Sequence, residues 1–196
     1  MREYTRRDRE AAALAAKLIA EEGRTWARAF RDAEAALGAK PDPDLTASEI
    51  RRWFALFSPT EHQATLDSKR RAAFTVMERV PELGLKLVGV VLSGAATEAS
   101  PAELVAVGAG EKEAFLAFLN AGLSPEPLER PYPTAFARRV KKLDTFVLDL
   151  GGEPVLVRIA PERTLLPGPA EPDEWQAEWE AAGALGKEAL AQALFG

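Results

Sequence analysis

Apolar residues recur at helical spacing through the first 80 residues. Between Trp26 and Leu37 the intervals are four, three and four residues, which is the spacing of one face of an amphipathic helix. A similar face around Leu14 ends near Gly23, and the second ends at Gly38. Because glycine readily adopts the left-handed conformation that closes a helix, the pattern predicts one helix before Gly23 and another from Trp26 to Gly38.

Two further helix starts follow a proline-rich turn. Thr46 with Glu49 three residues later has the pattern of a capping box, which predicts that a third, short helix begins there. Ser58 and Pro59 repeat the start pattern with proline at the first helical position, where its missing N–H costs nothing. The stripe that follows continues to Pro81, so the fourth helix is expected to be the longest.

The pattern changes after Pro81. Residues 85–92 form a short, continuous apolar run rich in valine, which predicts a buried strand, and residues 103–107 predict a second. A helix is expected over residues 111–121. Apolar positions then alternate on both sides of Gly151 and Gly152, the pattern of two strands joined by a two-residue turn.

The remaining segments are punctuated by proline and glycine. Four prolines over residues 125–133 predict an irregular loop, and residues 173–195 are expected to hold one or two small helices. The whole pattern predicts an α+β fold, with an N-terminal helical region followed by a small mixed sheet with flanking helices. We expect three regions, over residues 1–81, 82–165 and 166–196.

Composition narrows the classes of function. The 196 residues are 47% apolar and 28% charged, with a net charge of −5 and no cysteine, which fits a globular protein and excludes disulfides, thiolate catalysis and cysteine-bound zinc. No apolar run approaches the ~20 residues that cross a bilayer. We expect a cytoplasmic protein without membrane contact.

Residues 88–104 carry a more specific pattern, a strand followed by a glycine turn and a second strand. This stretch resembles the glycine-serine turn and Asp-x-Asp strand of the polymerase-β-type nucleotidyltransferase superfamily. The order of elements over roughly residues 8–165 is also similar to bacterial proteins that join a helical region to such a core. The resemblance implies a turn that holds nucleotide phosphates. It also implies three carboxylates that hold two Mg²⁺ ions for in-line phosphoryl displacement.

This chain departs from that pattern at most of the implied functional positions. Gly94 matches the turn glycine, but Ala95 stands where the superfamily has serine or threonine. Pro101 replaces the first aspartate, Glu103 the second, and Leu156 the third carboxylate. The candidate phosphate-binding turn is Ser93, Gly94 and Ala95, and the candidate remnant carboxylates are Glu103, Asp149 and Glu153.

Each candidate has a plainer interpretation. Glu103 near the edge of a short strand is expected to be solvated. The basic residues Arg138, Arg139, Lys141 and Lys142 could contact RNA or DNA, although such runs are usually solvated surface. His62, the single histidine, is expected at the surface or in a helix cap.

Three hypotheses follow. The first is a nucleotidyltransferase-fold protein that has lost catalysis and binds a nucleotide, RNA or a protein partner. The second is an active enzyme whose Mg²⁺ site is rebuilt from Glu103 with Asp149 or Glu153. The third is an interaction protein whose helical face from Trp26 to Phe57 docks a partner or a second copy, without any ligand.

Overall fold

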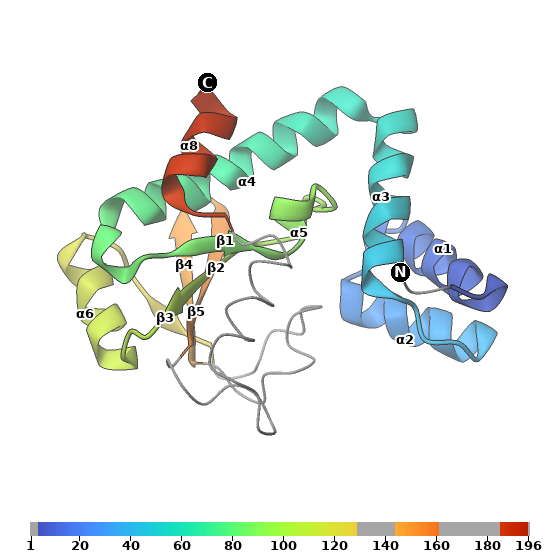
Figure 1. Ribbon diagram of the computed structural model, residues 1–196, viewed down its shortest axis with the longest axis horizontal. Helices are drawn as coiled ribbons and strands as arrows, with labels where there is room; N and C mark the ends of the chain where they lie inside the picture. Colours follow the sequence, from blue (N-terminus) through green and yellow to red (C-terminus); the bar gives the residue numbers. More distant parts are fainter. Residues whose placement is uncertain (1–3, 129–143, 161–184, 196) are drawn as a thin grey trace.

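The computed structural model describes residues 4–128, 144–160 and 185–195, and Figure 1 shows how their elements are arranged. These ranges contain seven α-helices and a five-stranded mixed sheet. The predicted α+β class is therefore confirmed. Three helices form a group at one end of the molecule, and the sheet lies at the other end beneath a long helix (Figure 1).

Helices α1 (Arg6–Ala20), α2 (Trp26–Leu37) and α3 (Pro43–Phe57) share one small core. Their predicted positions are confirmed, except that α3 begins earlier than Thr46 and is 15 residues long. Asp42 caps α3 by accepting hydrogen bonds from the N–H groups of Asp44 and Leu45. Since Asp42 already supplies the cap, Thr46 lies inside the helix, where its buried hydroxyl donates to the Asp42 carbonyl at 2.7 Å.

Helix α4 (Pro59–Arg79) is 21 residues long and connects the two ends of the molecule (Figure 1). Only Ser58 separates it from α3. Pro59 has no N–H and its ring clashes with the preceding helical turn, so α3 cannot continue through it. The chain therefore changes direction at Ser58 and starts α4. A short 3₁₀ turn, η1 (Pro81–Leu83), follows α4.

The sheet has the order β1-β2-β5-β4-β3, in which only β2 and β5 run parallel. Its strands are β1 (Lys86–Val88), β2 (Ala102–Val107), β3 (Glu126–Pro127), β4 (Asp144–Leu150) and β5 (Glu153–Ala160). The predicted strand at residues 103–107 and the predicted hairpin are confirmed. Gly151 and Gly152 have φ angles of 69° and 95°, as a two-residue turn with both central residues left-handed requires.

The predicted strand over residues 85–92 is only half right. The strand ends at Val88, and residues Gly89–Ser93 form the short helix α5. Gly89 has a φ of 74°, which turns the backbone out of the extended conformation despite the valines that follow. Gly94, with a φ of 76°, closes α5.

The two faces of the sheet have different surroundings. One face carries Leu104, Val155 and Val157, and it packs in the main core with α4, α6 (Glu111–Asn120) and α8 (Lys187–Phe195). The other face carries Glu103 and Arg158, which are also buried. Residues of α4 belong to the main core, whereas Ala95, just after α5, belongs to the small helical core and its neighbour Ala96 to the main core, so the two cores adjoin there.

Two predicted segments lie partly outside the described residues. In the proline-rich segment, Glu126 and Pro127 form β3, whereas residues 129–143 are not described. In the C-terminal segment, α8 agrees with the predicted helix, whereas residues 161–184 are not described. Within the described ranges, no helix combines the length and the apolar character that crossing a bilayer requires.

Candidate functional site

Glu103 lies on β2 with 3% of its surface exposed. The expectation that it is solvated is therefore wrong. In the parallel register of β2 and β5, Glu103 is the partner of Leu156, so two of the positions that the superfamily pattern singles out are adjacent in the sheet. A leucine side chain has no oxygen to offer a metal, so this strand pairing places no second carboxylate beside Glu103.

The partner of Glu103 is Arg158, which sequence reasoning missed. The Arg158 Nη2 atom lies 3.0 Å from Glu103 Oε2, and the two side chains are only 6% and 4% exposed. Yet neither of these atoms has a properly directed hydrogen bond, and Arg158 Nε also has none. The guanidinium group of Arg158 faces the carboxyl group of Glu103, but the hydrogen-bonding capacity of both is left partly unused, at a cost of about 1–3 kcal/mol per buried group.

Burial has the largest effect on the pKa of the Glu103 carboxyl group. Removal from water raises the pKa of Glu103 from 4.5 to about 7, because a buried carboxylate loses its hydration, while the positive charge of Arg158 opposes the rise. A carboxyl group with this pKa is about half protonated at neutral pH. It is therefore a weaker ligand for a divalent cation than an ionised aspartate.

Gly89 leaves the space in which the Glu103 carboxyl group lies. A Cβ atom at Gly89 would come within 3.3 Å of both Glu103 Cδ and Oε1. The positive φ of Gly89 disfavours any other residue for a second reason. Gly89, rather than Gly94, is thus the glycine that contacts the one retained carboxylate of the candidate site.

The candidate phosphate-binding turn uses its amides internally. The N–H groups of both Gly94 and Ala95 bond to the carbonyl of Val90, closing α5. The Ser93 carbonyl accepts a hydrogen bond from Arg51 at 2.9 Å, and Ala95 is completely buried. A phosphate cradle needs N–H groups that point to solvent, and these two do not supply them.

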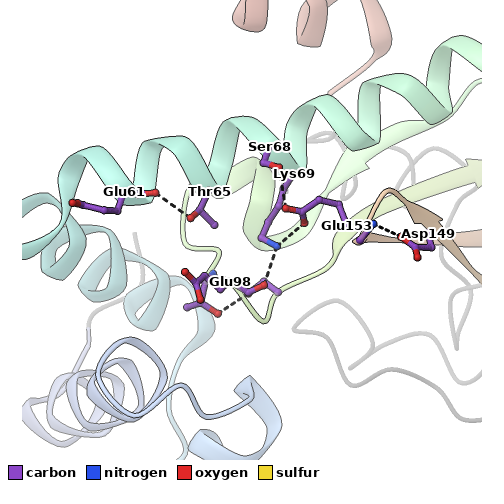
Figure 2. Close-up of polar contacts among 10 residues, drawn as sticks. Glu61, Thr65, Ser68, Lys69, Glu98, Asp149 and Glu153 are labelled. Atoms are coloured by element: carbon purple, nitrogen blue, oxygen red, sulfur yellow. Dashed lines mark hydrogen bonds and ion pairs between the residues drawn. The ribbon is translucent and has the colours of Figure 1, made fainter.

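A second ion pair, between the buried Lys69 and the partly exposed Glu153, lies on the face of the sheet that packs against α4 (Figure 2). Lys69 of α4 is 2% exposed, and its Nζ atom donates to Glu153 Oε2 and to the Glu98 carbonyl, both at 3.0 Å. Ser68 donates to the other oxygen of Glu153 at 2.9 Å. This Lys69 cluster, defined as Lys69, Ser68, Glu153 and the Glu98 carbonyl, ties α4 to the hairpin and to the loop before β2.

The three candidate carboxylates do not meet. Glu153 points toward α4 and is held in the Lys69 cluster, whereas Glu103 lies on the other face of the sheet. Asp149 accepts a hydrogen bond from the Gly152 N–H at 2.6 Å and thereby stabilises the hairpin turn. Across the described part of the chain, no three acidic or histidine side chains gather in a way that could hold a metal ion.

The basic cluster and His62 were also singled out in the sequence. The basic residues Arg138, Arg139, Lys141 and Lys142 lie outside the described residues, so nucleic-acid contact by them stays a prediction.

His62 is partly buried rather than fully solvated. Its ring stacks on Phe54 with 4.0 Å between centroids, and its Nε2 lies 3.0 Å from the Ala96 carbonyl. Burial lowers the pKa of His62, so it is neutral at pH 7.

A groove of about 780 Å³ runs between α4, the hairpin tip and the segment after α6. Arg71, Arg79 and Thr75 lie on its α4 wall, and Glu126 and Asp149 lie opposite. The groove is therefore mixed in charge. It is lined neither by Glu103 nor by the residues of the glycine turn.

Comparison of the chain with protein-family models, with curated proteins and with solved structures gave no match. One clue to Lys69 is visible in the sequence, because it falls in the buried stripe of α4 between Leu66 and Ala73. Arg158 offers no such clue, since a charged residue at an alternate strand position normally faces water.

Proposed function

We propose that this chain is a degenerate nucleotidyltransferase-fold protein, which acts by binding and has lost metal-dependent nucleotidyl transfer. The observation that supports the proposal is the Glu103–Arg158 pair. The chain keeps a strand, a glycine and a second strand with one acidic residue. At the point where the superfamily gathers carboxylates, the described strands β2 and β5 carry Glu103, Leu156 and Arg158.

The residues present do not fit a two-ion Mg²⁺ site. Mg²⁺ requires hard oxygen ligands in near-octahedral geometry, and the cationic Arg158 lies 3.0 Å from the Glu103 carboxyl group. A divalent cation there would have to overcome repulsion from a buried guanidinium group, which stays protonated at any working pH. No step of phosphoryl transfer is therefore assigned to this chain.

The rebuilt-site hypothesis requires Glu103 to act together with Asp149 or Glu153. Its weakness is spatial, since Glu153 is engaged by Lys69 on the opposite face of the sheet and Asp149 is engaged by the hairpin turn. Bringing them to Glu103 would require breaking the Lys69 cluster or the β4–β5 hairpin. The binding proposal needs no such rearrangement.

Incubation of the purified chain with labelled ATP, CTP, GTP or UTP, Mg²⁺ or Mn²⁺, and RNA or protein acceptors tests the proposal. We expect no transfer from the wild type. Transfer by the wild type that disappears in Glu103→Gln and persists in Glu82→Gln would contradict the proposal and support a catalytic Glu103. The Glu82→Gln variant is the matched control, because it changes an exposed carboxylate in η1 that belongs to none of the candidate sites.

Isothermal titration calorimetry with the same four nucleotides tests whether the ligand is a nucleotide. Because the amides of Gly94 and Ala95 are used within α5, we expect any nucleotide binding to depend little on Mg²⁺ and on this turn. Absence of heat with all four nucleotides removes the nucleotide version of the proposal. RNA or a protein partner then remains as the class of ligand.

A further inference from the structure

A shallow apolar hollow of about 210 Å³ lies on the helical end of the molecule, between α1 and α3. It is lined by Ala13 and Ala16 of α1 and by Trp53, Leu56 and Phe57 of α3. Leu56 and Phe57, at the end of α3, are each 67% exposed. Two of the side chains that line the hollow are thus large, apolar and exposed.

The two aromatic side chains of this surface, Trp53 and Phe57, pack against each other. The Trp53 ring packs against Phe57 with 5.2 Å between centroids, and its Nε1 donates to Glu21 Oε1 at 3.1 Å. Trp53, Leu56 and Phe57 fall at i, i+3 and i+4, so they share one face of α3. An exposed apolar patch of this kind is unfavourable in free energy, because its surface stays in contact with water unless another molecule covers it.

The charges around the hollow favour a second copy as the covering molecule. Lys17 and Arg52 line it together with Glu49, so both signs of charge are present on one rim. A rim of one sign would call for a partner of the opposite sign. A mixed rim matches itself in a two-fold pair, because each residue of one patch meets a different residue of the other.

We propose that this surface is a homodimer interface, in which Leu56 and Phe57 of one copy occupy the Ala13–Ala16 hollow of the other. Glu49 of each copy then faces Lys17 or Arg52 of its partner across the rim. The proposal stands on α1 and α3 alone and does not depend on the loss of nucleotidyl transfer.

Sedimentation equilibrium of the full chain over a range of concentrations tests the interface. We expect a concentration-dependent dimer for the wild type, and a dissociation constant at least about 30-fold weaker for Leu56→Glu with Phe57→Glu, as removal of interface anchors gives. The matched control is Leu116→Glu, at a residue of α6 that is 56% exposed, and it should dimerise as the wild type does. Because Leu56 and Phe57 are exposed, circular dichroism should show both variants folded.

Exchanging the charges on the rim tests whether these residues face each other across the interface. We expect that Glu49→Lys alone and Lys17→Glu with Arg52→Glu each dimerise more weakly than the wild type, and that mixing these two variants restores a dimer between them. A wild type that is monomeric at about 100 μM, which means an association free energy weaker than about −5.5 kcal/mol, would overturn the proposal. So would a dimer that survives Leu56→Glu with Phe57→Glu, or mixed variants that remain monomers.

Discussion

The two buried ion pairs lie on opposite faces of one sheet and differ in how well they are satisfied. In the Lys69 cluster every charged group has hydrogen bonds, since Lys69 donates twice and Glu153 accepts from both Lys69 and Ser68. In the Glu103–Arg158 pair, Glu103 Oε2 and Arg158 Nε and Nη2 have none. The first pair is also partly hydrated, because Glu153 is 29% exposed, whereas both members of the second pair are almost fully buried.

This difference separates a stabilising pair from a costly one. A buried ion pair offsets its desolvation only when good geometry and additional hydrogen bonds accompany the attraction of the charges. The Lys69 cluster meets that condition and joins three segments that are distant in sequence. The Glu103–Arg158 pair does not meet it, so we expect it to contribute little net stability.

Removing the anion of the Lys69 cluster should have the largest effect. Glu153→Ala leaves a lysine that is 2% exposed without its counter-ion, and we expect a loss of about 3–5 kcal/mol in the free energy of unfolding, toward the lower end because Glu153 is partly hydrated. Urea unfolding at pH 7 measures this. Glu98→Ala is the control, since Lys69 contacts only the carbonyl of that residue, and an equal loss there would contradict the assignment.

The protonation of Glu103 predicts a pH dependence of comparable size. Burial raises the pKa of Glu103 from 4.5 to about 7, so below pH 4.5 the carboxyl is protonated in both states and its contribution is fully present. As the pH rises through 7, the unfolded chain has released this proton while the folded chain must ionise a buried group. Stability is then lost, by about 3 kcal/mol in total.

Comparison with Glu103→Gln isolates this contribution from the other titrating groups. Urea unfolding of both proteins at pH 4.5 and pH 8 should show the wild type losing about 3 kcal/mol relative to the variant as the pH rises. A difference between the two proteins that does not change with pH would show that the pKa of Glu103 is the same in the folded and unfolded chains.

Replacing both members of each pair with neutral side chains sharpens the comparison. We expect Glu103→Leu with Arg158→Met to leave the free energy of unfolding unchanged or to raise it by up to about 2 kcal/mol at pH 8. Lys69→Met with Glu153→Gln should lower it, because hydrogen bonds worth about 1 kcal/mol each are lost. Equal effects of the two double replacements in urea unfolding would remove the distinction between the pairs.

The smallest expected effect concerns the two glycines of α5. Gly89→Ala and Gly94→Ala both place a side chain at a positive φ, which costs about 1–2 kcal/mol. Only Gly89→Ala also crowds the Glu103 carboxyl, whereas the nearest atom to a Cβ at Gly94 belongs to the flexible Arg51 side chain at 3.5 Å. Thermal unfolding should therefore rank Gly89→Ala as the less stable variant by about 1 kcal/mol, and the reverse order would contradict the close contact.

Local patterns in the sequence were sufficient for most of the fold. The spacing from Trp26 to Leu37 predicted α2, and Gly151 with Gly152 predicted the hairpin, because both depend on backbone and neighbour effects within a few residues. The strand predicted over residues 85–92 was half wrong. Valine-rich residues favour strands, but the left-handed Gly89 and the packing of α5 on β2 override that preference.

The candidate site was less predictable because its contacts are not local. Glu103 and Arg158 lie on strands that are adjacent in space and far apart in the chain, and Lys69 and Glu153 are separated by 84 positions. The sequence singled out Glu103 and Glu153 but neither of their cationic partners. Without the strand register, nothing distinguishes Arg158 from a solvated arginine.

Carbon-13 NMR of the labelled Glu103 carboxyl group, titrated with acid and then with Mn²⁺, tests the central claim most directly. If Glu103 is a buried partner of Arg158 and not a metal ligand, its resonance should titrate near pH 7, move when Arg158 is replaced by methionine, and keep its width when Mn²⁺ is added. A resonance that titrates near 4.5 and is broadened by Mn²⁺ at micromolar concentration would contradict the account.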